Sequence, residues 1–101
     1  MSGGEIIVRV DRRLADLLPR FVAQCRREAA EIRRAVEAEN LVAVRAIGHV
    51  LTGAGGGYGI DEISRLGREI EQAASSGEAE AVLRLAAALD DYAGRLKLVY
   101  D

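Results

Sequence analysis

The sequence predicts an all-α protein, an antiparallel four-helix bundle with a short extended segment at its N-terminus. Apolar residues recur at spacings of three and four along most of the chain, which is typical of amphipathic helices. Turn-forming residues separate these runs by short connections, so consecutive helices should lie antiparallel. The length of 101 residues suits one domain. We expect residues 1–10 to be the extended segment and residues 11–101 to form the bundle.

The first elements are predicted from capping signals. Glu5–Val10 is rich in β-branched residues, as is Leu98–Tyr100, and these segments either pair or cover one end of the core. Asp11 can cap a short N-terminal turn, and Pro19 favours the first turn of a long helix that runs to about Ala38. The apolar stripe of this helix consists of Leu18, Phe21, Val22, Cys25, Ala29, Ile32 and Val36.

Three further helices follow. Asn40 is expected to cap the second, which the glycines of Gly53–Gly59 end. Asp61 is expected to cap the third, Ser75–Gly77 to end it, and Glu78 to begin the fourth, which continues nearly to the end of the chain. Their apolar stripes are, in order, Leu41, Val44, Ile47, Leu51 and Ala54; Ile63, Leu66, Ile70 and Ala74; and Val82, Leu85, Ala86, Leu89, Tyr92, Ala93 and Leu96.

Composition excludes several classes of function. A formal net charge of −2 argues against general nucleic-acid binding. Cys25 is the only cysteine and His49 the only histidine, so neither an intrachain disulfide nor a zinc site of these residues can form. Every apolar run falls far short of the roughly 20 residues that span a bilayer. We expect a cytoplasmic protein without a membrane or nucleic-acid partner.

His49 is the first candidate for chemistry. It faces outward from the second predicted helix, and Gly48 and Gly53 lie close to it in a segment where glycine lowers helix stability. Close approach by another protein would explain such glycines. On position alone, however, a single helical histidine is more simply an exposed side chain without a role.

Other constellations favour structural interpretations. The Gly53–Gly59 stretch has neither the lysine of a phosphate-binding loop nor a preceding strand, so we interpret it as a helix end that lets two helices pack, with Tyr58 anchoring the turn. The serines have no second histidine with which to build a hydrolase site. The carboxylates Asp61, Glu62, Glu69 and Glu71 are placed as caps or on solvated helix faces.

The segment His49-Val-Leu-Thr-Gly53, followed by Ala-Gly-Gly-Gly-Tyr-Gly59 and then by Ile60, Ile63, Leu66 and Ile70-Glu71, resembles the histidine-containing phosphotransfer (Hpt) domain family. The resemblance covers Leu14 to about Leu96. It implies that His49 accepts a phosphoryl group from an aspartyl phosphate on a receiver domain, or from a kinase, and passes it to a response regulator. It also implies a phosphocarrier rather than an enzyme, without a cofactor of its own, because Mg²⁺ belongs to the partner receiver domain.

One position departs from the family pattern. Thr52 stands where the family usually has lysine, and we expect Arg45, one turn before His49, to supply the missing positive charge. Gly53 would leave room for the partner, which is a receiver domain or a hybrid histidine kinase. Docking residues are expected to be Val42, Ala46 and Val50.

Two alternatives stay open. The chain could be an interaction module that binds a receiver or kinase without being phosphorylated, or a nucleotide-binding or enzymatic domain built on the glycine turn. We expect a monomer. A dimer through Ile6, Val8 and Val10, or through the last helix, would be compatible with phosphotransfer.

Overall fold

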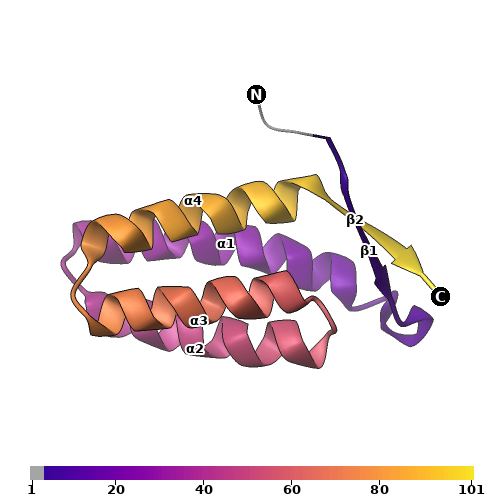
Figure 1. Ribbon diagram of the computed structural model, residues 1–101, viewed down its shortest axis with the longest axis horizontal. Helices are drawn as coiled ribbons and strands as arrows, with labels where there is room; N and C mark the ends of the chain where they lie inside the picture. Colours follow the sequence, from indigo (N-terminus) through magenta and orange to yellow (C-terminus); the bar gives the residue numbers. More distant parts are fainter. Residues whose placement is uncertain (1–3) are drawn as a thin grey trace.

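A computed structural model describes residues 4–101 of the protein, so residues 1–3 of the expected N-terminal segment lie outside the described part. The predicted helix bundle is confirmed, with two short strands added at one end (Figure 1). The elements are β1 (Ile6–Val10), a short 3-10 helix η1 (Arg12–Leu14), α1 (Leu18–Glu37), α2 (Leu41–Gly57), α3 (Asp61–Ser75), α4 (Ala79–Arg95) and β2 (Leu96–Tyr100). None of the described helices is both long and apolar enough to cross a membrane.

Predicted capping residues begin η1 and α2, and the predicted proline begins α1. The Oδ1 atom of Asp11 accepts the backbone N–H of Arg13 at 2.8 Å. Hydrogen bonds from the Arg13 side chain, and then this backbone bond, lower the pKa of Asp11 to about 2. Pro19 lies in the first turn of α1, where its missing N–H removes no helical hydrogen bond. Asn40 caps α2 by accepting the N–H of Ala43 at 3.1 Å. These three predictions are confirmed.

The glycine segment ends α2 as predicted, because the helix stops at Gly57 within it, Tyr58 is the C-cap, and Gly59 follows with a positive φ of 77°. Two other predicted boundaries are wrong. Asp61 is the first residue of α3 and Ile60 is the cap, so the Asp61 carboxylate acts on the helix dipole rather than on a cap hydrogen bond. Helix α4 ends at Arg95, and Leu96 already belongs to β2.

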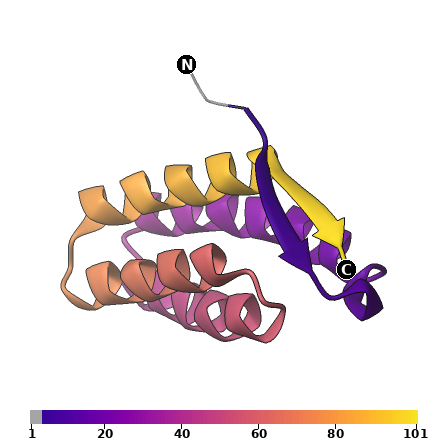
Figure 2. The ribbon, with the colours of Figure 1, turned by 45° about the vertical axis from the view of Figure 1, so that its right-hand side comes forward.

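The two strands do pair. They form a two-stranded parallel sheet in which Ile6 is opposite Leu96 and Val10 opposite Tyr100. A parallel pair needs a long crossover connection, and here the whole helix bundle provides it. Figure 2 shows the sheet lying across the end of α1 and α4. Val8 and Val10 pack toward the core, whereas Ile7 is 65% exposed.

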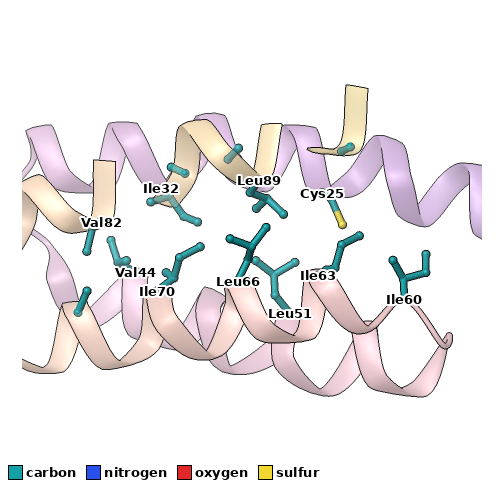
Figure 3. Packing of buried hydrophobic residues seen from close by; sticks show 14 of the residues in the cluster. Cys25, Ile32, Val44, Leu51, Ile60, Ile63, Leu66, Ile70, Val82 and Leu89 are labelled. Atoms are coloured by element: carbon teal, nitrogen blue, oxygen red, sulfur yellow. The ribbon is translucent and has the colours of Figure 1, made fainter. Parts of the chain in front are cut away.

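The core runs along the inside of the bundle (Figure 3) and receives side chains from all four helices. Its largest fully buried residues are Leu18, Ile32, Ile60, Ile63, Ile70, Leu89, Val44, Val82 and Cys25. Burial in this apolar surrounding raises the pKa of the Cys25 thiol to about 12, which keeps it protonated and unreactive. Tyr58 packs on Phe21 with 4.8 Å between ring centroids, and so joins the end of α2 to α1.

Helices α2 and α3 approach each other most closely, along three buried glycines that we call the glycine seam: Gly48, Gly55 and Gly67. A Cβ atom added to Gly55 would lie 2.5 Å from the backbone nitrogen of Ser64, and one on Gly67 would lie 2.7 Å from that of Thr52. No real Cβ contact is so short. The seam therefore brings the two helix backbones together at a distance that any side chain would prevent.

Packing at the glycine seam predicts that replacing glycine by alanine changes the free energy of unfolding in opposite directions at two positions of α2. Gly55→Ala should lower the free energy of unfolding by about 1–3 kcal/mol, because the new methyl group overlaps the backbone of α3. Gly53→Ala should raise it by up to about 1 kcal/mol, because a Cβ there meets open space and alanine favours the helix. Urea denaturation of both variants measures this. Equal effects would show that α2 and α3 do not pack through the seam.

Candidate functional site

His49 lies in the middle of α2 and faces solvent, with 76% of its side chain exposed. The outward orientation predicted for it is confirmed. Its Nδ1 atom is 3.2 Å from Oε2 of Glu71 on α3. A carboxylate only accepts hydrogen bonds, so Nδ1 carries the proton in this contact. In the neutral imidazole, Nε2 is then left without a proton and with its lone pair available.

The glycine seam places Glu71 beside His49. Gly48 immediately precedes His49, and a Cβ on Gly48 would lie 2.8 Å from the backbone nitrogen of Glu71. The backbones of α2 and α3 are therefore in contact next to the two side chains. The Glu71 side chain is 31% exposed and the histidine far more so, which leaves the imidazole open to another molecule on its outer side.

A shallow hollow surrounds the imidazole. It is lined by Val42, Arg45, Ala46, His49, Val50, Glu71 and Ser75. Val42 is 78% exposed and Val50 66%, so two large apolar side chains flank the histidine in solvent. The structure thus brings the expected docking residues and Arg45 together with His49. Among residues 4–101, Arg45 makes none of the salt bridges.

A second, more apolar groove continues from this hollow toward α1. Its walls are Phe21, Gln24 and Glu28 of α1 and Ala46, Ile47, Val50, Leu51, Ala54 and Tyr58 from α2 and its C-cap. Ala46 and Val50 belong to both depressions. The apolar surface beside His49 is therefore wider than the residues selected from sequence.

The two glycines near His49 have different roles. Gly48 is buried against α3, so helix packing explains this glycine. The expectation that it lies on the exposed face and makes room for a partner protein is wrong. Gly53 is exposed, and nothing lies within 4 Å of a Cβ built on it. Only Gly53 keeps the surface beyond His49 free for close approach.

Thr52 is partly buried and its hydroxyl is already engaged. It donates to the carbonyl oxygen of Gly48 at 2.9 Å, within α2. The Thr52 carbonyl in turn accepts the hydroxyl of Ser64 on α3 at 2.7 Å. Thr52 therefore joins the α2–α3 contact and presents no charge to the hollow. In the part of the chain that the structure describes, no group of His, Cys, Asp and Glu is arranged to hold a metal ion.

The sequence model of the Hpt domain family matches residues 16–97. The chain belongs to the Hpt domain family. Hpt domains are phosphocarrier modules that act with receiver domains and histidine kinases in phosphorelay signalling. Neither the curated proteins nor the solved structures give a significant match to this Hpt domain.

Sequence reasoning on this Hpt domain missed the contact of Glu71. The residue pattern predicts Glu71 as a cap or on a solvated helix face, and its carboxylate instead meets His49 across the α2–α3 contact. A signal was present, because Ile70-Glu71 stands where the resembled family has a Leu-Glu or similar pair. What the residues alone did not supply is the relative rotation of α2 and α3.

The contact predicts the tautomer of His49. In neutral His49 the proton should reside mainly on Nδ1, because Glu71 accepts it there. Nitrogen-15 NMR of the imidazole above neutral pH measures the two tautomers. Glu71→Ala should shift the population toward Nε2–H, whereas Glu69→Ala, which removes a carboxylate bound to Arg65 instead, should not. A wild-type imidazole protonated mainly on Nε2 would contradict the contact.

Proposed function

We propose that this Hpt domain carries a phosphoryl group on Nε2 of His49, taking it from the aspartyl phosphate of a receiver domain or from a kinase and passing it to the receiver domain of a response regulator. The observation that carries the proposal is the exposed imidazole whose Nδ1 is engaged by Glu71. This contact directs the unprotonated nitrogen away from α3 and toward solvent, where a partner can reach it.

The transfer balances without a base on this chain. The Nε2 lone pair attacks phosphorus, the bond from phosphorus to the aspartyl oxygen breaks, and the partner's aspartate leaves as a carboxylate. Nδ1 keeps its proton throughout, and the Glu71 carboxylate stabilises the positive charge that the ring gains. The reverse sequence delivers the phosphoryl group to the next receiver. Mg²⁺ acts on the receiver side, so this chain needs no cofactor of its own.

The surface around His49 fits a transient partner. Val42, Ala46 and Val50 are exposed next to the imidazole and supply apolar contact area. Gly53, one turn further along α2, adds no side chain that would hold a partner away. A carrier must release each partner, so we expect an interface at the low end of the usual size range.

Arg45 is proposed as the cation that assists transfer. Thr52 occupies the position of the usual lysine, but its hydroxyl is bonded to Gly48 and it carries no charge. Arg45 lines the same hollow as His49 and forms no salt bridge within residues 4–101. A guanidinium there can pair with phosphate oxygens as they arrive.

Phosphorylation is the direct test of the proposal. Incubated with a receiver domain phosphorylated by a small phosphodonor, the wild type should acquire acid-labile, base-stable phosphate, and His49→Gln should acquire none. Circular dichroism of the variant provides the control for folding. Equal labelling of wild type and His49→Gln would contradict the assignment of His49.

The proposed role of Arg45 predicts a rate effect. Arg45→Ala should slow transfer to His49 by about five- to tenfold, which corresponds to about 1–1.4 kcal/mol in the barrier. Arg33→Ala is the matched control, because Arg33 lines a hollow between α1 and α4 and should leave the rate unchanged. Rapid-quench kinetics with one phosphorylated receiver measures both variants. An unchanged rate in Arg45→Ala would contradict the proposed role of Arg45.

The engaged hydroxyl of Thr52 also favours a second candidate, a module that binds a receiver or kinase without being phosphorylated. Measurements of receiver binding and of phosphate transfer with wild type and His49→Gln distinguish the two functions. In the second, a receiver binds wild type and His49→Gln equally well and no phosphate is transferred to either. In the first, transfer is lost with His49 while binding persists.

A further inference from the structure

The β1–β2 sheet has an open outer edge on β1. Asp101 donates its backbone N–H to the carbonyl oxygen of Val10 at 3.0 Å, so the peptide groups of Val10 face β2. In a parallel pair, successive residues direct their N–H and C=O groups alternately toward and away from the partner strand. Val8 and Ile6 therefore also bond toward β2, and the N–H and C=O groups of Ile7 and Arg9 point outward. Within residues 4–101, β1 makes no backbone hydrogen bond beyond its pairing with β2 and Asp101.

The side chains of β1 alternate in the same way. Ile6, Val8 and Val10 lie on the face that turns toward the bundle, and Glu5, Ile7 and Arg9 lie on the exposed face. Ile7 is 65% exposed although it is a large apolar residue. Isolated two-stranded sheets are marginal, and parallel sheets are normally covered on both faces. This sheet is thus smaller and more open than its type normally allows.

We propose that a second copy of this chain pairs with the open edge of β1, antiparallel and about a two-fold axis through Ile7. The result is a continuous four-stranded sheet in the order β2–β1–β1–β2. In this register Ile7 meets Ile7 of the other copy, and both belong to the set of residues whose N–H and C=O groups point outward. The backbone groups left open in one protomer are then satisfied by the same groups in its partner.

The charges of β1 indicate that the strand pairing with its open edge is β1 of a second copy. With Ile7 on the axis, Glu5 of each chain lies opposite Arg9 of the other, on the same face as the isoleucine pair. The strand is thus complementary to itself, with two symmetric ion pairs flanking an apolar contact. In one protomer these charges have only exposed neighbours, Arg9 with Asp101 at 3.3 Å and Glu5 with Lys97 at 3.9 Å. Such exposed pairs contribute little to stability and can exchange for cross-strand partners.

The interface is separate from the phosphotransfer site. No residue of β1 lines the hollow around His49 or the groove between α1 and α2. A single added strand pair buries little area, so we expect a dimer in concentration-dependent equilibrium with the monomer. The proposal is independent of the phosphocarrier function and revises the monomer expected from the sequence.

Charge reversal tests the register. Sedimentation equilibrium over a range of concentrations should show a dimer for the wild type. Glu5→Arg and Arg9→Glu should each raise the dissociation constant about tenfold, because both symmetry-related pairs become like-charged. The double variant Glu5→Arg/Arg9→Glu should restore dimerisation. Lys97 and Asp101 remain mismatched with the reversed charges in the double variant, so recovery can come only from the partner strand.

Amide hydrogen exchange provides a second readout that needs no substitution. The N–H groups of Ile7 and Arg9 should exchange more slowly as concentration rises, while that of Val8, already bonded to β2, should not change. A wild type that stays monomeric at the highest concentration overturns the proposal. A dimer whose dissociation constant is unchanged from the wild type in both single reversals also overturns it, because its interface would then lie elsewhere.

Discussion

The contact between the backbones of α2 and α3 is the constraint on which the rest of the structure depends. Gly48, Gly55 and Gly67 allow it, because a Cβ atom on any of them would lie within 2.8 Å of backbone on the opposing helix. Glycine lowers the intrinsic stability of a helix interior, so the close packing of the two helices must offset that cost. The hydroxyl of Ser64, bonded to the Thr52 carbonyl at 2.7 Å, adds a polar link beside the seam.

The same contact connects packing to chemistry. Because Gly48 is held against α3, the next residue, His49, lies within hydrogen-bonding distance of Glu71 and still faces solvent. A carboxylate at Nδ1 leaves the other ring nitrogen as the nucleophile and supports the charge of the phosphorylated ring. Phosphoryl transfer depends mainly on positioning and electrostatics, so a rigid two-helix support suits a carrier.

Features that depend on neighbouring residues could be predicted from the sequence, whereas the relative placement of helices and strands could not. Asp11, Pro19 and Asn40 act within a few residues of themselves, so single-sequence reasoning placed them correctly. Gly48 and Glu71 were misassigned because their roles depend on how α2 and α3 are rotated against each other, which helical periodicity leaves open. The glycine segment was also predicted correctly as the end of α2, because Gly59 supplies the positive φ that commonly follows a helix C-cap. The pairing of β1 with β2 joins opposite ends of the chain, so neither segment alone could decide it.

The measurement that tests the central claim most directly is the rate of phosphoryl transfer to Gly67→Ala. A Cβ there would lie 2.7 Å from the backbone nitrogen of Thr52 and 2.9 Å from the carbonyl oxygen of Gly48, so the substitution separates α2 from α3 and leaves His49 and Glu71 themselves unsubstituted. If the seam positions the histidine, transfer to the folded variant is slower than to the wild type, and the Nδ1–H tautomer is less populated. A transfer rate and tautomer population equal to those of the wild type would contradict the account.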